Sequence, residues 1–310
     1  MEAVETKTFL LALTKMGKLK RMSLEEFGAQ RRGGKGVIAL KIEEDDVVSY
    51  LLPATEDDHL LCFTTLGKCH ILKVSDIPEL GRYAKGILVS KLMELENEER
   101  VAAVVSVSSF PEGLEVVMLT KQGMIKKTEL SKFARPRAGG IKAVTIHEGD
   151  ELSGARISDG KSSILVATKS GRAIRFDETL VRSTGRGASG VKAMRLKEGD
   201  GVAGFLVGND QSSAVTVTEG GFGKRTPMSK YRSSGRGGQG VTNIKSIEKT
   251  GAVVALVGAG GEDELLVGSS HGKAIVIKAQ DIRETGRAST GVRIMRLDEG
   301  DKVVVAEKTG

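Results

Sequence analysis

Apolar residues recur along the whole chain in short runs, and glycines separate one run from the next. Residues 164–168, 172–176 and 191–196 are three such runs within one stretch of about fifty residues, and residues 101–105 form a Val-rich run of a further kind. Alternation of apolar and polar positions, β-branched residues and glycine punctuation favour strands over helices. The pattern therefore predicts an all-β protein built from many short strands.

Two landmarks recur in phase and divide the chain into repeats. The first is a Gly followed by Val or Ile, at Gly36, Gly86, Gly140, Gly190, Gly240 and Gly291, with spacings of 50, 54, 50, 50 and 51 residues. The second is Thr/Ser-x-x-Gly, ending at Gly17, Gly67, Gly123, Gly171, Gly221 and Gly272. The two glycines are 19 residues apart in five repeats and 17 in the third. The chain therefore contains six repeats of about fifty residues.

Each repeat predicts four strands. A Val-rich strand comes first, a second strand enters the Thr-x-x-Gly hairpin turn, a third leaves it, and a Gly- and Arg-rich loop leads to a fourth. Six such units without linkers predict blades arranged radially in one domain, residues 1–310. The first repeat begins at its second strand (residues 8–13), and the chain ends in an extra Val-rich strand near residues 302–307. We expect this last strand to complete the first blade, which removes two exposed edges.

The charge of the chain points to an anionic partner. Lys and Arg number 47 against 40 Asp and Glu, so the net charge is +7, which favours nucleic acid as a partner. Aromatic residues make up only 4%, which argues against a binder of single strands that stacks bases on exposed rings. Two cysteines give no disulfide framework, and neither a signal peptide nor a membrane-spanning apolar run is evident, so we expect a soluble cytoplasmic protein.

The cations keep a constant register within the repeats. Four residues before the landmark glycine lie Arg32, Arg82, Arg186, Arg236 and Arg287, with Arg135 and Arg137 beside this position in the third repeat. Five residues after the glycine lie Lys41, Lys91, Arg195, Lys245 and Arg296. Four residues after the hairpin glycine lie Arg21, Lys127, Arg175 and Arg225. A surface that serves only solubility intersperses both signs of charge. The register instead predicts a band of cations around the ring.

A circular basic band suits duplex DNA bent around it. Lys and Arg neutralise phosphates and release counterions, and glycine lets backbone N–H groups approach the phosphates closely. Bending 20–30 base pairs by 40–90° costs on the order of 1–6 kcal/mol, so many contacts must share the load. A contact set repeated six times does this without reading bases, as histones do.

One loop exceeds the common pattern. Residues 30–36 read Gln30-Arg31-Arg32-Gly33-Gly34-Lys35-Gly36, and only Lys85 recurs at an equivalent place among the extra polar residues. This heptapeptide is identical to the signature box of the C-terminal domain of the DNA gyrase A subunit. The six repeats, with degenerate boxes such as residues 285–291, resemble that family over essentially the whole chain.

The resemblance implies a six-bladed β-pinwheel, a propeller-like ring in which neighbouring blades exchange a strand, with the box on the first blade. It implies positive wrapping of double-stranded DNA around the rim, with residues 30–36 as the element that wrapping requires. The parent enzyme uses ATP and Mg to supercoil DNA negatively, as a heterotetramer of A and B subunits in the bacterial cytoplasm at the nucleoid. This domain would then be non-catalytic, cofactor-free and monomeric, because Tyr50, Tyr83 and Tyr231 lack a catalytic context and no Walker motif is present.

Two other functions remain open on the sequence. The homologous domain of topoisomerase IV binds DNA but wraps it poorly, and its box is degenerate, so the intact box disfavours it. A propeller that serves as a protein-interaction scaffold is a second alternative. That class more often has seven blades, and it does not predict a register of cations.

Two motifs are weaker. Residues 185–190 and 235–240 match Gly-x-Gly-x-x-Gly, but a dinucleotide site needs a helix next and the pattern predicts a strand. His59, Cys62, Cys69 and His70 could form a zinc set across the hairpin turn, yet the equivalent positions in other repeats are ordinary packing residues. We expect no metal site.

Overall fold

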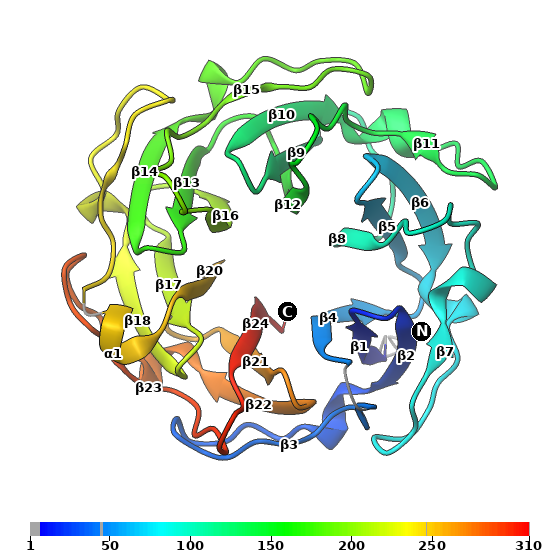
Figure 1. Ribbon diagram of the computed structural model, residues 1–310, viewed down its shortest axis with the longest axis horizontal. Coiled ribbons are helices and arrows are strands. Elements are labelled where there is room, and N and C mark those ends of the chain that lie inside the picture. Colours follow the sequence, from blue (N-terminus) through cyan, green and yellow to red (C-terminus); the bar gives the residue numbers. More distant parts are fainter. Residues whose placement is uncertain (1–6, 44–45, 246, 310) are drawn as a thin grey trace, which may run out of the picture.

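The computed structural model describes residues 7–43, 46–245 and 247–309, and these residues form a ring of six four-stranded antiparallel sheets (Figure 1). The fold is the predicted all-β, six-bladed β-pinwheel. Within the described residues the helices are single turns, and none is long and apolar enough to cross a membrane. They are η1 (Leu24–Glu26), η2 (Val74–Asp76), η3 (Val89–Lys91), η4 (Leu130–Phe133), η5 (Glu178–Leu180), η6 (Met228–Lys230), η7 (Ala279–Asp281) and α1 (Ile247–Thr250).

A hairpin forms the centre of every sheet. Its turn is the Thr/Ser-x-x-Gly landmark: the Thr14 hydroxyl oxygen accepts a hydrogen bond from the Lys18 N–H (3.1 Å), and Gly17 has a positive φ of 83°. Turn chemistry therefore sets the position of each hairpin in the sequence. The hairpins are β1 (Thr8–Thr14) with β2 (Lys18–Ser23), β5 (His59–Thr64) with β6 (Lys68–Lys73), β9 (Glu115–Thr120) with β10 (Met124–Glu129), β13 (Ser163–Thr168) with β14 (Arg172–Asp177), β17 (Ser213–Thr218) with β18 (Phe222–Pro227), and β21 (Glu264–Ser269) with β22 (Lys273–Lys278).

The Val-rich strands line the central channel, and each pairs with the hairpin that precedes it in the sequence. They are β4 (Val48–Thr55), β8 (Val101–Val107), β12 (Leu152–Ser158), β16 (Val202–Gly208), β20 (Val253–Gly258) and β24 (Val303–Lys308). The expectation that the last strand completes the first blade is therefore wrong: β24 pairs with β21 of the sixth sheet. The chain returns from the rim to the hairpin turn it has just left, where the Lys15 N–H donates to the Val47 carbonyl (2.8 Å). Because the chain returns at this turn, the new strand β4 runs antiparallel to β1, the first strand of the preceding hairpin.

The fourth strands form the outer edges of the sheets and are exchanged between neighbours. They are β3 (Val37–Ile38), β7 (Ile87–Leu88), β11 (Ile141–Lys142), β15 (Val191–Lys192), β19 (Val241–Thr242) and β23 (Val292–Arg293). The predicted strand over residues 191–196 is thus only two residues long, and it pairs with β10 of the preceding repeat rather than with its own hairpin. The strand exchange implied by the family resemblance is confirmed, since all six outer strands lie on another repeat's sheet.

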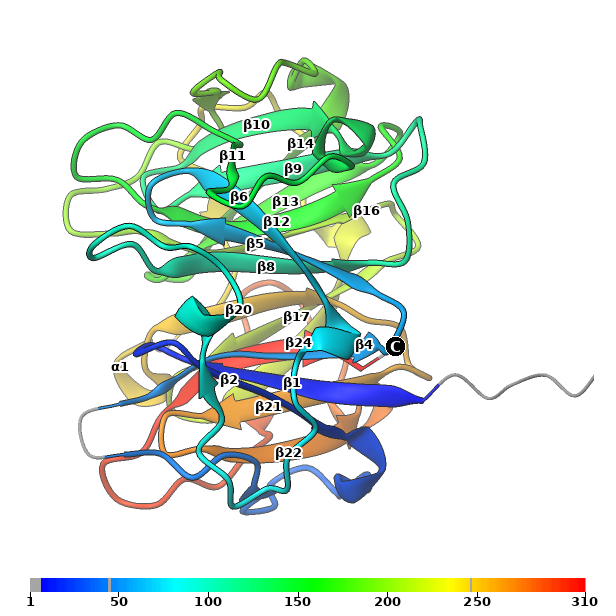
Figure 2. The ribbon, with the colours of Figure 1, turned by 90° about the vertical axis from the view of Figure 1, so that its right-hand side faces the viewer.

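The exchange also closes the ring. β3, from the first repeat, pairs with β22 of the sixth sheet, and the inner strands β24 and β4 are in contact. The box at residues 30–36 leads into β3, so it lies over the sixth sheet. The expectation that it lies on the first blade is therefore wrong in this respect. Figure 2 shows the ring from its edge, with the inner strands roughly along the ring axis.

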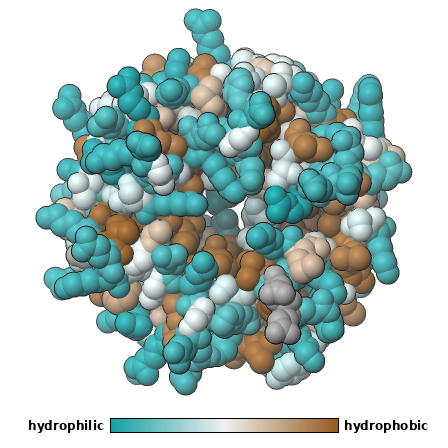
Figure 3. All heavy atoms as spheres, in the orientation of Figure 1, coloured by the Kyte–Doolittle hydropathy of each residue, from teal (hydrophilic) through white to brown (hydrophobic). Residues whose placement is uncertain are grey.

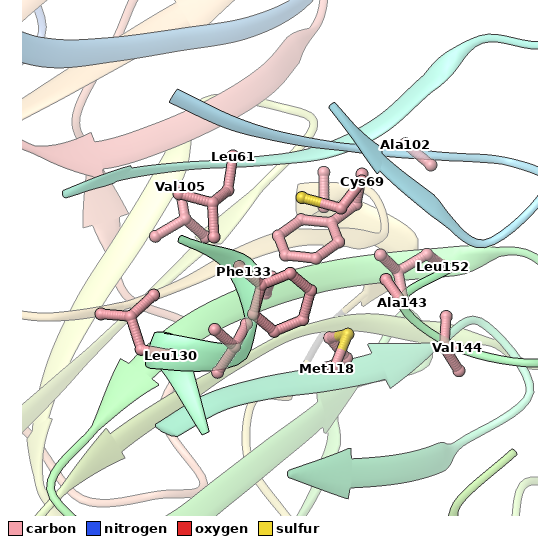
Figure 4. Packing of buried hydrophobic residues seen from close by; sticks show 14 of the residues in the cluster. Leu61, Cys69, Ala102, Val105, Met118, Leu130, Phe133, Ala143, Val144 and Leu152 are labelled. Atoms are coloured by element: carbon pink, nitrogen blue, oxygen red, sulfur yellow. The ribbon is translucent and has the colours of Figure 1, made fainter. Parts of the chain in front are cut away.

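The hydrophobic core is divided into six clusters, each between two neighbouring sheets. One cluster joins Leu61, Phe63 and Cys69 of the second sheet to Met118 and Leu152 of the third (Figure 4). Successive residues of β1 contribute to two clusters, Leu10 to one and Leu11 to the other. The central strands are therefore buried on both faces, which explains their continuous apolar runs.

Candidate nucleic-acid interface

The box loop crosses from the first repeat onto the sixth sheet and is held there by its backbone. The Gln30 N–H donates to the Val276 carbonyl (2.7 Å), and the Gly33 N–H donates to the Ile294 carbonyl (2.7 Å). The Gly34 carbonyl accepts a hydrogen bond from the N–H of Arg296 (2.9 Å). The box is thus part of the seam that joins the first repeat to the last.

Two box residues, Gln30 and Gly34, pack closely together at this seam. A Cβ atom on Gly34 would lie 2.9 Å from the Ile275 Cδ1 methyl and 2.9 Å from the Gln30 side-chain oxygen. The Gln30 side chain therefore folds over Gly34, and Ile275 fills the space beneath it. A side chain at position 34 would displace the ends of both of these side chains.

We expect Gly34→Ala to destabilise the domain by about 1 kcal/mol, because the new methyl group crowds a half-buried site and the ends of the Gln30 and Ile275 side chains must shift to admit it. Gly28→Ala is the matched control, since nothing lies within 4 Å of a Cβ at that glycine. Ile275→Val, which removes the opposing methyl group, should restore part of the loss in the double variant. Denaturant unfolding of the unaltered protein, the variants Gly34→Ala and Ile275→Val, and the double variant measures this interaction. If the two single losses in the free energy of unfolding simply add in the double variant, residues 34 and 275 are not in contact.

The three box cations point to solvent. Arg31, Arg32 and Lys35 are exposed, and among the described residues none of their side chains forms an ion pair or hydrogen bond. The backbone around them is fixed by the seam, so three positive charges without an ion pair among the described residues are held in place on this loop. Such a loop can neutralise phosphates without first breaking internal ion pairs.

The other rim cations flank the outer strands. We define the outer rim as the six outer strands, the Gly- and Arg-rich loops before them and the few residues after them (Figure 1). Figure 3 shows hydrophilic side chains along the circumference of one face and a hollow at its centre. Of the predicted positions, Arg82, Arg186 and Arg287 are half-buried. The exposed ones are Lys41, Lys85, Lys91, Arg135, Arg137, Arg195, Arg236, Lys245 and Arg296.

Some of these rim cations already have local partners. Lys85 lies 2.7 Å from Glu43, and hydrogen bonds from Lys85 and Lys18 hold the pKa of the Glu43 carboxyl below its usual value. Arg82 lies 3.4 Å from Glu26, and the Arg236 guanidinium donates to the carbonyls of Leu180 and Lys192 (3.1 Å each). The box cations differ from these in having no such partner.

Four predicted rim residues do not belong to the exposed band. Arg21, Lys127 and Arg175 are buried and Arg225 is half-buried. Each is paired with a carboxylate: Arg21 with Glu56 (3.0 Å), Lys127 with Glu115 (2.7 Å), Arg175 with Asp210 (2.6 Å) and Arg225 with Glu284 (3.5 Å). The expectation that they join the exposed band is wrong, because each side chain is wholly or partly covered and paired with an acid. Glu56, Asp210 and Glu284 come from loops, and Glu115 comes from β9 of the same sheet.

The buried Lys127–Glu115 pair should matter for stability. Glu115→Ala leaves a buried ammonium without its partner, so we expect a loss of about 3 kcal/mol in the free energy of unfolding. The exposed pair Lys121–Glu151, at the same distance of 2.7 Å, is the control. Glu151→Ala should cost less than about 1 kcal/mol. Equal losses in denaturant unfolding would show that burial does not distinguish the two pairs.

Sequence reasoning missed two further sets of exposed cations on the rim. One set lies eight residues before the landmark glycine, and the other lies on the outer strands themselves. Both could have been found from the same register. They are Arg182, Arg232 and Arg283, and Lys142, Lys192 and Arg293.

The two weaker motifs have ordinary structural explanations. Residues 185–190 lead into the strand β15 rather than a helix. Cys62 and Cys69 pack into different core clusters on opposite faces of the second sheet, so they cannot bind one ion together. Burial raises the pKa of the Cys62 thiol to about 12, as expected for a packing residue.

A closed ring of six strand-exchanged sheets, with a Gly- and Arg-rich loop crossing onto each preceding sheet, defines a β-pinwheel. The family model described as "DNA gyrase C-terminal domain, beta-propeller" matches residues 8–55, 58–108, 114–159, 162–209, 213–257 and 263–309, so the chain belongs to this family. It is 44% identical to the DNA gyrase A subunit of Halalkalibacterium halodurans and 46% identical to that of Streptococcus pyogenes serotype M1, over 99% and 98% of the chain. The chain spans 37% of the length of either relative.

Solved structures agree. A DNA gyrase A C-terminal domain superposes with a TM-score of 0.89 at 29% identity, covering 97% of this chain and 99% of that one. The C-terminal domain of a DNA topoisomerase IV superposes with a TM-score of 0.72 at 23% identity, covering 99% and 94%. The second likeness shows the shared fold.

Proposed function

We propose that this domain binds duplex DNA without sequence specificity and wraps it in the positive sense around the outer rim. In this proposal it forms part of the A subunit of a DNA gyrase, which assembles with a B subunit in the bacterial cytoplasm and supercoils DNA negatively with ATP and Mg. The domain contributes no catalytic residue and no cofactor. Residues 30–36 and the exposed rim cations contact the phosphates.

The position and charge of the box at the seam are the main support for this proposal. Its three cations form no ion pair or hydrogen bond among the described residues, and hydrogen bonds to the last sheet hold their backbone in place. DNA that follows the rim meets this loop at the place where the first and sixth repeats join. A fastening point there fixes the path of the duplex over the ring, and a fixed chiral path changes the linking number of a closed circle.

The test is topological. Nicked plasmid is bound by the domain, ligated, stripped of protein and resolved by gel electrophoresis. We expect a shift of positive sign that grows with protein concentration. No shift, together with weak binding that is insensitive to salt, would overturn the proposal.

The homologous role in a topoisomerase IV is the alternative that the same experiment separates. A domain of that kind is expected to retard DNA on a native gel while leaving the linking number nearly unchanged. A protein-interaction scaffold would do neither.

A further inference from the structure

Three buried lysines lie beneath alternate loops of the rim. Lys20, Lys126 and Lys224 each follow a hairpin glycine by three residues, and their side chains are at most 1% exposed. Burial lowers the pKa of Lys20 and Lys126 to about 8 and that of Lys224 to about 7. The other three sheets have His70, Ile174 and Ile275 at this position. Lysine therefore occupies every second sheet of the ring.

Each lysine donates hydrogen bonds to the rim loop that crosses its sheet. In all three cases the acceptors include the carbonyls of the same two loop positions, the glycine and the rim arginine that follows it. Lys20 Nζ donates to the carbonyls of Gly81 (2.9 Å), Arg82 (2.9 Å) and Ala84 (3.0 Å). Lys126 Nζ donates to those of Gly185 (2.8 Å), Arg186 (3.0 Å) and Ala143 (2.9 Å). Lys224 Nζ donates to those of Gly286 (3.2 Å) and Arg287 (2.6 Å) and to the Thr226 hydroxyl (3.2 Å).

These hydrogen bonds set the direction of the neighbouring amides. In a trans peptide the carbonyl of one residue and the N–H of the next point in opposite directions. With the carbonyls of Gly185 and Arg186 drawn inward, the N–H groups of Arg186 and Gly187 face away from the sheet. The same holds for Arg82 with Tyr83 and for Arg287 with Ala288. In the part of the chain that the structure describes, these six N–H groups donate to no protein acceptor.

Two successive N–H groups that face the same way form a concavity that binds anions. The lysine also withdraws two carbonyl oxygens that would otherwise repel a phosphate. We propose that Lys20, Lys126 and Lys224 are positioning residues that build three phosphate-binding amide pairs on the rim. The pairs are Arg82–Tyr83, Arg186–Gly187 and Arg287–Ala288. This inference rests on the proposed binding of DNA, and the ligand is the phosphodiester backbone.

The remaining sheets show how the same space is filled without lysine. Ile275 lies beneath Gly34, and Ile174 lies beneath Gly238, where a Cβ atom would be 3.3 Å from the Ile174 methyl group. In these two sheets, an isoleucine on the third strand is therefore accompanied by a glycine at the loop position that lies over it. Above the three lysines the same loop position holds Ala84, Ala188 and Ser289. The chain thus contains two packing solutions that can be exchanged.

This exchange supplies the experiment. One variant combines Lys20→Ile/Ala84→Gly, Lys126→Ile/Ala188→Gly and Lys224→Ile/Ser289→Gly, so that all three loops take the isoleucine–glycine packing. The control has only the three glycine substitutions and keeps the lysines. At fixed salt we expect the exchanged variant to bind linear duplex DNA about tenfold or more weakly, because hydrogen bonds to charged phosphates are lost. Its linking-number shift should fall, while the control resembles the unaltered protein.

Amide hydrogen exchange reads the site directly. In the unaltered protein, exchange of the Tyr83, Gly187 and Ala288 amides should slow when DNA binds. If the full variant does not fold, Lys126→Ile/Ala188→Gly alone should lose protection at Gly187 and keep it at Tyr83 and Ala288. Unchanged affinity in a folded exchanged variant, or no protection of these amides in the unaltered protein on DNA, would overturn the inference while DNA wrapping stands. An unaltered protein that produces no linking-number shift would instead refute the proposed function.

Discussion

Replacing Arg31, Arg32 and Lys35 together by alanine is expected to abolish the positive linking-number shift while the ring stays folded. The three side chains are exposed and make no ion pair or hydrogen bond within the described residues, so the free energy of unfolding should change by less than about 0.5 kcal/mol for each. Much of the DNA affinity should remain, because the rest of the rim still binds. Each lost phosphate contact should lower the salt slope of binding by about 0.9.

The control for this variant is another set of three exposed rim cations. Arg182→Ala, Arg232→Ala and Arg283→Ala remove the same total charge but leave the seam untouched. We expect a similar drop in salt slope and a linking-number shift that is reduced but present. If both variants lose the shift equally, the box contributes only charge. If the box variant wraps normally, residues 30–36 are an ordinary surface loop.

Gly36→Ala is expected to open the ring at the seam. Gly36 has a φ of 71°, and a Cβ atom there would lie 2.7 Å from the Ala274 carbonyl oxygen of β22. The left-handed backbone and the overlap together should cost about 2–4 kcal/mol, and separating β3 from β22 relieves both. The pairing of β3 with β22 is the strand exchange that links the two ends of the chain.

The measurement is a distance between spin labels in the turn that follows β4 of the first sheet and in the loop that precedes β21 of the sixth sheet. Asp57→Cys and Glu262→Cys place labels at two exposed positions, and the native Cys62 and Cys69 are buried. Gly36→Ala should lengthen and broaden this distance, and it should also weaken the linking-number shift because the box moves with the seam. Gly190→Ala is the control, since its Cβ atom would lie 2.4 Å from the Ile125 carbonyl in the middle of the chain. Gly190→Ala should destabilise the domain by a similar amount and leave the distance between the labels unchanged. If the distance also stays the same in Gly36→Ala, contacts other than the β3–β22 pairing hold the seam closed.

The site was partly predictable, and the errors have a common cause. The cations five residues after the landmark glycine are exposed as expected, although the outer strands end before these positions. Arg21 and Arg175 were misplaced because their partners, Glu56 and Asp210, come from segments that only the folded ring brings near. Lys126 was overlooked because a lysine in a basic repeat resembles a solvated one. Its burial depends on a loop that begins 59 residues further along the chain.

The amino-acid sequence is sufficient to predict the six repeats, the hairpin in each and the all-β ring, because turn chemistry and apolar periodicity are local and act over a few residues. It also marked residues 30–36 as exceptional. The folded ring was needed to show which hairpin each inner and outer strand joins, that the box lies on the sixth sheet, and which cations have no ion-pair partner among the described residues. These depend on pairings between segments tens to hundreds of residues apart, and the outer strands are only two residues long, too short for their own pattern to specify a partner.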